Sequence, residues 1–162
     1  MFDWLETTSL AIWVKESWGW PLALTIHAFG SATIVGFSFI IFLRSFGLLQ
    51  TIPPASLISL LPYIWVCVAL QACSGFLLWL TKPGRYIEAG IFDVKLALVV
   101  SGIVTTLYVQ KMLKRKAADW TSSEAIPSGL KLILMMALAW SAVLIAGRLT
   151  AYFGIYATAM AR

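Results

Sequence analysis

The sequence predicts an all-α integral membrane protein: a four-helix transmembrane bundle with a short N-terminal interfacial helix. Of the 162 residues, 60% are hydrophobic and 12% are charged, and the mean hydropathy is +0.88. These values are too apolar for a soluble domain of this length. The apolar residues also form runs of the about 20 residues that a spanning helix needs. No other segment is long enough for a soluble catalytic domain, so a stand-alone enzyme is not expected.

Four segments qualify as spans, and short polar breaks separate them. The breaks contain the sequences TIPPAS, TKPGRY and DWTSSEAIPSG, and their proline and glycine residues mark chain reversals. The predicted spans are residues 21–43, 56–80, 91–113 and 129–154.

The first 19 residues differ from the rest of the chain. Four tryptophans lie among the first twenty residues, and indole rings favour the headgroup level of a membrane. We therefore expect residues 1–19 to be an amphipathic segment with a short helix in the interface. Residues 20–162 are expected to form a single transmembrane domain.

Basic residues predict the orientation through the positive-inside rule. Arg44, Lys131 and the cluster in residues 111–116 lie on one side of the predicted bundle, and the basic residues of the other side are diluted by acids. We therefore expect a multi-pass protein of the bacterial inner membrane with residues 111–131 in the cytoplasm and both termini in the periplasm. Contact with anionic membrane lipids then explains the net charge of +5, and no nucleic-acid partner is needed.

Polar residues inside the spans gather in the half of the bundle nearer the two termini, which we call the outer half. At a rise of about 1.5 Å per residue, His27 and Arg148 lie about 10 Å below the outer face, Gln71 and Ser74 about 10–14 Å, and Lys95 about 6 Å. The other half, the inner half, is almost wholly apolar in the first, second and fourth spans. Because polar groups in hydrocarbon usually face a cavity or the bundle interior, we expect one shared site in the outer half.

Two stripes of residues at spacings of three and four support this site. On the first span the stripe is His27, Gly30, Ser31, Ile34 and Ser38; on the fourth it is Ser141, Leu144, Arg148 and Tyr152. Small residues beside the histidine would let something flat, either a helix or a ring, come close.

The charges of the site are unbalanced. Arg148 cannot lose its charge, and Lys95 is a second, shallower cation. Asp93 is the only carboxylate near the outer end of a span. We therefore expect the missing negative charge on a ligand, and haem propionates or a lipid phosphate would supply it.

His27 is the only histidine of the chain, and three interpretations of it stay open. It could be a neutral imidazole that hydrogen-bonds across helices, an axial ligand of haem b or part of a proton relay. In the haem interpretation His27 is the metal ligand, and the predicted cofactor-binding residues are His27, Gly30, Ser31, Gln71, Lys95, Arg148 and Tyr152.

Three short motifs cover the polar positions of the spans. They are His-x-x-Gly (His27, Gly30), Phe-x-x-Lys (Phe92, Lys95) and Gly-Arg-x-x-Ala-Tyr (residues 147–152). Together they resemble a family of small bacterial four-helix membrane proteins of unknown function and, more remotely, the copper-resistance D family and four-helix b-type cytochromes. The resemblance implies haem b, and either electron transfer with a redox partner or haem or gas sensing.

The resemblance has one large departure. Such cytochromes hold each haem between two histidines, and this chain has one. The methionines do not replace the second histidine, because Met112, Met135 and Met136 belong to the inner half and Met160 to the outer tail. A haem would therefore be five-coordinate or shared between two copies of His27.

Two further predictions follow from spacing. Ala32 and Gly36 form a small-xxx-small pair that permits close helix approach, so we expect a homo-oligomer. Cys67 and Cys73 lie six residues apart on one helix, too far for a disulfide.

The competing functional prediction is a non-redox membrane protein. In it, His27 and Arg148 form a structural polar cluster or bind an anion or a lipid.

Overall fold

The computed structural model describes residues 3–84, 90–116 and 129–160. Within these ranges every regular element is a helix. The helices are α1 (Asp3–Glu6), α2 (Ser9–Glu16), α3 (Gly19–Phe46), α4 (Pro54–Leu80), α6 (Ile91–Lys116) and α7 (Leu130–Met160).

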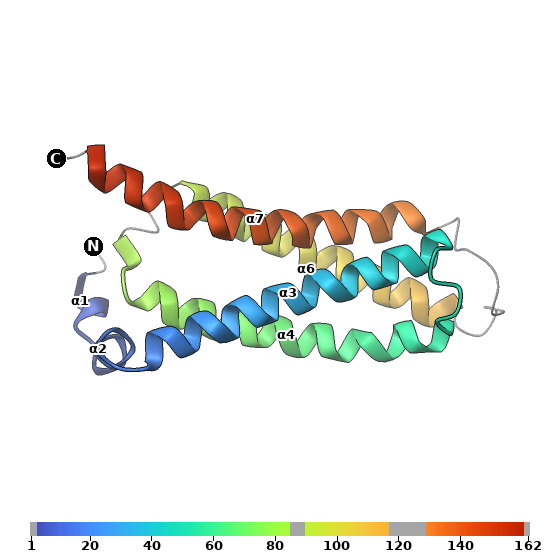
Figure 1. Ribbon diagram of the computed structural model, residues 1–162, viewed down its shortest axis with the longest axis horizontal. Coiled ribbons are helices and arrows are strands. Elements are labelled where there is room, and N and C mark those ends of the chain that lie inside the picture. The colour runs from blue at the N-terminus through green and yellow to red at the C-terminus, as the bar shows by residue number, and fades with distance from the viewer. Residues whose placement is uncertain (1–2, 85–89, 117–128, 161–162) are drawn as a thin grey trace.

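The four long helices α3, α4, α6 and α7 run side by side as a bundle (Figure 1). In the part of the chain that the structure describes, these four are long and apolar enough to cross a membrane. α3 packs against α4 and α7, α7 also packs against α6, and the α4–α6 seam is the loosest of the four. The protein is therefore a multi-pass transmembrane four-helix bundle, as the sequence predicts.

Both ends of the chain lie at the same end of the bundle, together with α1 and α2 (Figure 1). The turn between α3 and α4 lies at the opposite end. At that turn Gly47 adopts φ 98°, a left-handed conformation that glycine accepts without a steric cost and that ends α3. Pro54 then opens α4 at a position where a missing backbone N–H costs nothing.

The apolar core lies in the inner half of the bundle. Its members are Ile34, Ile41, Leu57, Leu61, Ile64, Val109, Leu113, Ile133, Met136 and Trp140, and each is at most 4% exposed. The Trp140 indole donates to the Thr106 hydroxyl at 2.9 Å, and its ring lies against Gly102, where a Cβ would come within 2.9 Å. The apolar core is thus in the inner half, which also buries the polar side chains of Ser38, Arg44 and Ser45, and α6 and α7 are in close contact there.

Arg44 is fully buried at the inner end of α3. Its Nε donates to the carbonyl of Ile52 at 2.7 Å, which ties α3 to the start of α4. The sequence placed Arg44 only among the basic residues of this side. In the structure, it also helps to hold the turn together.

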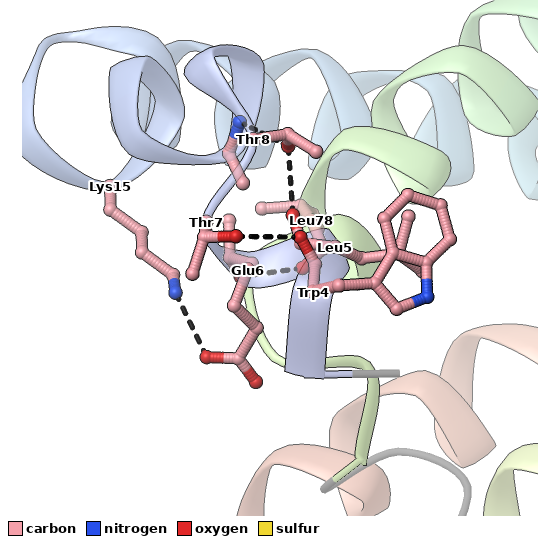
Figure 2. A network of polar contacts seen from close by, with 9 residues as sticks. Trp4, Leu5, Glu6, Thr7, Thr8, Lys15 and Leu78 are labelled. Atoms are coloured by element: carbon pink, nitrogen blue, oxygen red, sulfur yellow. Dashed lines mark hydrogen bonds and ion pairs between the residues drawn. The ribbon is translucent and has the colours of Figure 1, made fainter. Parts of the chain in front are cut away.

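The N-terminal segment forms two short helices, α1 and α2 (Figure 2). The Thr8 hydroxyl accepts from the Ala11 N–H and so caps α2, while Lys15 pairs with Glu6 at 3.0 Å. α2 buries Ala11 and Val14 and leaves its tryptophan 53% exposed. This is the face pattern expected of a helix in the interface.

Candidate functional site

A group of polar side chains joins α3 to α4 in the outer half. His27 Nδ1 lies 3.0 Å from the Ser74 hydroxyl. The Gln71 side-chain N–H donates to the backbone carbonyl of His27 at 2.8 Å and also to the hydroxyl of Ser31. The predicted residues His27, Gly30, Ser31 and Gln71 are therefore close together, on two facing helices.

Glycine residues allow this close approach. A Cβ on Gly30 would lie 3.3 Å from Gln71 Cγ and 3.6 Å from the carbonyl oxygen of Cys67. A Cβ on Gly75 would lie 3.1 Å from Cε1 of His27. The flat partner expected beside Gly30 is therefore helix α4 itself, which leaves no room for a ring between α3 and α4.

The hydrogen bonds of Ser74 indicate which nitrogen of His27 carries a proton. A hydroxyl has one proton to donate, and that of Ser74 points to the carbonyl of Leu70 at 2.7 Å. With that proton on the Leu70 carbonyl, the hydroxyl oxygen accepts from Nδ1 in the tautomer of His27 that carries its proton there. In a neutral imidazole this leaves Nε2 with a free lone pair.

Lys95 approaches the same region from α6. Its side chain is half-buried and lies beside Gly147 of α7, where a Cβ would be 3.7 Å from both Cε and Nζ. It is close enough to His27 for its charge to act on the imidazole. Residues of all four long helices therefore border the site.

Arg148 lies elsewhere. Its side chain is exposed, and Leu144, one turn before it, is 36% exposed. The face that α7 turns to the bundle carries Met136, Trp140 and Gly147 instead. Leu144 and Arg148 of the predicted stripe therefore lie off the contact face of α7, which is set by Gly147, about 100° around the helix from Arg148.

Gly147 lies beside the end of the Lys95 side chain, so Arg148, the next residue, is at about the level of that ammonium group. Tyr152 belongs to α7, but its side chain lies outside the described residues.

One buried acceptor of the site is unused. The side-chain oxygen of Gln71 is buried and has no hydrogen-bond partner among the described residues. Such an acceptor is costly to leave without a donor. It is a place where the hydroxyl of a ligand or a water molecule would bind.

A small cavity of about 130 Å³ lies on the other side of Ser74. It lies between α2, α3 and α4, and Trp13, Ile26, Leu70 and Ser74 are among its lining residues. Its walls are mostly apolar side chains, so it provides space next to the site but few polar contacts.

The metal-binding capacity of the site depends on His27. No group of three or more His, Cys, Asp or Glu residues that could hold a metal ion occurs among the described residues. Cys67 and Cys73 are free thiols, as the spacing predicted.

Sequence reasoning placed Ser74 at the right depth but missed its pairing with His27. It also missed Gly75, which faces His27, and it named Gly147 only within a motif and not as the neighbour of Lys95. The available signal was the gathering of small residues at one depth on separate spans. A single sequence does not say which of those residues face one another.

Comparisons with protein-family models, with curated proteins and with solved structures found no match.

Proposed function

We propose that the protein is a haem b-binding subunit of the bacterial inner membrane, with His27 as the iron ligand in the outer half of the bundle. The observation that carries the proposal is the contact of His27 Nδ1 with Ser74. Histidines that ligate metals usually donate their other ring N–H to a fixed oxygen, which holds the ring and makes the ligating nitrogen more basic. Ser74 provides such an oxygen.

The available space limits where the group would lie. Gln71 and α4 occupy the surface beside Gly30, so the macrocycle would lie on the side of His27 that faces α6 and α7. Lys95 would then meet a propionate, and Arg148 would be a contact only at the surface of the chain.

The donor set provides one axial bond. Met136 belongs to the apolar core, and Met112 and Met135 also lie in the inner half. The haem would be five-coordinate within one chain, or six-coordinate if a second His27 comes from another copy in a homo-oligomer. When bound, it would supply one-electron transfer to a redox partner or an open position for a diatomic gas.

The positive-inside rule supports the proposed position of the site relative to the two faces of the membrane. It places both termini in the periplasm, so that the His27 site lies near the periplasmic face.

The test is the visible absorption spectrum of protein purified in detergent from cells with adequate haem. We expect a Soret band in the wild type and its loss in His27→Ala. Ser74→Ala should keep the band but retain haem about 10–100-fold less tightly, as is typical when the partner of a ligating histidine is removed. Ser59→Ala is the matched control, because Ser59 bonds only within α4, and it should resemble the wild type.

Two results would overturn the haem proposal: a colourless wild type, or a His27→Ala variant with its full haem content. A high-spin spectrum would indicate one haem per chain, whereas a low-spin spectrum would indicate a shared haem.

The second candidate function is a non-redox membrane protein in which the cluster is structural or binds an anion or a lipid. The donation of Gln71 to both His27 and Ser31 favours it, because these bonds join α3 and α4 without a ligand. In that case the protein would be colourless, and Gln71→Ala would lower its free energy of unfolding by about 0.6 kcal/mol and at most by about 1.7 kcal/mol, the average and the maximum measured for interhelical hydrogen bonds in a membrane protein.

A further inference from the structure

We infer that the inner ends of α6 and α7 form a binding site for the headgroup of an anionic phospholipid. A hollow of about 390 Å³ lies there, bordered by Tyr108, Lys111, Met112, Arg115 and Leu132. Its volume is within the range of small-molecule sites, about 300–1,000 Å³. We call it the basic groove.

The four residues from α6 lie on one face of that helix. They are Tyr108, Lys111, Met112 and Arg115, separated by three, one and three positions, so they are neighbours on successive turns. Leu132 contributes the opposite wall from α7. The groove is therefore a feature of two packed helices rather than of a loop.

The groove is positively charged. Along the described inner ends of α6 and α7 the charged side chains are all cations, Lys111, Lys114, Arg115 and Lys131, and each is exposed. Arg115 can bind two phosphate oxygens at once, Lys111 adds a compact charge, and the Tyr108 hydroxyl is a further donor. An anion with several oxygens is the chemistry that this set recognises.

The apolar walls favour a lipid over a free anion. Met112 and Leu132 border the groove beside the two cations, so an occupant gains most if it carries an apolar chain next to its phosphate. Basic pockets between spanning helices at the cytoplasmic side bind anionic headgroups in this way. The groove lies at the opposite end of the bundle from His27, so it does not depend on haem binding.

The test is native mass spectrometry of the full chain in detergent, titrated with phosphatidylglycerol and separately with phosphatidylcholine. The groove variant is Lys111→Gln with Arg115→Gln. The control is Lys114→Gln with Lys131→Gln, which removes the same charge from the same end of the bundle but from outside the groove.

We expect the wild type to prefer phosphatidylglycerol. The preference should fall about thirtyfold in the groove variant, since each cation contributes about 1 kcal/mol and about 1.36 kcal/mol corresponds to a factor of ten. The control should stay close to the wild type, and an excess of inorganic phosphate should not displace the lipid. Equal binding of the two lipids, equal losses in both variants, or displacement by inorganic phosphate would each overturn the inference.

Discussion

Gly30 sets the distance between α3 and α4 at the candidate site. The nearest atoms to the place of its missing side chain belong to Gln71 and to the Cys67 carbonyl. Those neighbours are fixed, because Gln71 donates to two groups of α3 and the carbonyl belongs to the backbone. A larger residue at Gly30 would push the two helices apart and stretch the hydrogen bonds.

We therefore expect Gly30→Leu to lower the free energy of unfolding by about 1–3 kcal/mol, the usual cost of overpacking. Intrinsic helix propensity acts in the opposite direction, because leucine favours a helix more than glycine does. Thermal unfolding in detergent would measure the effect. Ala28→Leu is the control, since Ala28 lies on the exposed face of the same helix; a loss of equal size in both variants would contradict the prediction.

The depths estimated from the sequence made Arg148 the more important cation of the site, whereas the structure favours Lys95. Lys95 is half-buried and close to His27, whereas Arg148 is exposed. Under the haem proposal, we expect Lys95→Gln to weaken haem retention at least about tenfold, because a hydrogen bond to a charged group contributes about 1.5–3 kcal/mol. Arg148→Gln should have a smaller effect.

The comparison is made by transfer of haem from each variant to an excess of apomyoglobin. If Arg148→Gln releases haem faster than Lys95→Gln, then the side chain of Arg148 has a role in binding that its exposed position in the single chain does not explain.

At the scale of residues, the sequence was informative about depth and uninformative about partners. The stripe of His27, Gly30 and Ile34 on α3 is the face that α3 turns to its neighbours, because small and polar residues at helical spacing seldom face lipid. The fourth-span stripe failed at Arg148 because Arg148 and Gly147 are adjacent in sequence but differ by about 100° in direction. Only the packing of α7 on α6 decides which of the two faces inward.

Among the elements, α2 depends on Gly19 for its position. A Cβ there would lie 2.8 Å from the Trp13 ring and 2.9 Å from the Cα of Val14. The second distance involves backbone and cannot be relieved by a change of rotamer. The first residue of α3 and the middle of α2 can therefore touch only if residue 19 has no side chain.

We expect Gly19→Val to release α2 from α3 and α4 without unfolding the bundle. The measurement is the alkylation rate of Ala11→Cys, in a background of Cys67→Ser and Cys73→Ser, since Ala11 is fully buried on the inward face of α2. The rate should rise at least about tenfold, as for a segment whose local opening becomes about 1.4 kcal/mol easier. Gly84→Val is the control, because a Cβ on Gly84 meets nothing within 4 Å.

The N-terminal segment also shows what the sequence left open at this scale. Its tryptophans predicted a helix in the interface, but the break between α1 and α2 was not foreseen. Thr7 and Thr8 make that break, because their hydroxyls donate to the carbonyls of Trp4 and Leu5 and so compete with a continuous helix.

For the whole molecule, the first prediction concerns orientation. Glu16 and Gln50 are exposed at opposite ends of the bundle, so single cysteines at these positions report on the two faces of the membrane. In the same cysteine-free background, we expect an impermeant maleimide to label Glu16→Cys in intact spheroplasts and Gln50→Cys only after permeabilisation. The reverse pattern would invert the orientation and place the His27 site near the cytoplasm.

A second prediction at this scale concerns assembly. Ala32 and Gly36 are exposed, and a Cβ on Gly36 would meet nothing within 4 Å. This open face of small residues remains available to another copy of the chain. We expect the wild type to form a homo-oligomer in mild detergent. Gly36→Leu should weaken this association at least about tenfold and so shift the protein toward the monomer, because close helix approach needs small side chains.

Light scattering with the detergent mass subtracted would measure the assembly. Ala97→Leu is the control, because Ala97 is exposed on a different helix, α6. A wild type that is monomeric at every concentration would contradict the prediction and would also exclude a haem shared between two chains.

The global arrangement was the most predictable part of the protein. The hydrophobic runs fixed four spans, and α3, α4 and α6 begin within two residues of the predicted positions. Hydropathy records contact with lipid, which every span has, so it reports the number of helices and their ends well. It does not record which helices touch, and the loose seam between α4 and α6 left no trace in the sequence.

The seam between α4 and α6 affects how a molecule dissolved in the membrane reaches the site. In the inner half it is closed by the Trp65 indole, which donates to the Gln110 side chain at 2.8 Å. Because α4 and α6 pack less closely than the other neighbouring helices, we expect a molecule dissolved in the bilayer to reach the Lys95 and His27 region most easily between these two helices. Entry by this lateral route would need only the outer ends of α4 and α6 to separate, while the Trp65–Gln110 contact acts as the hinge.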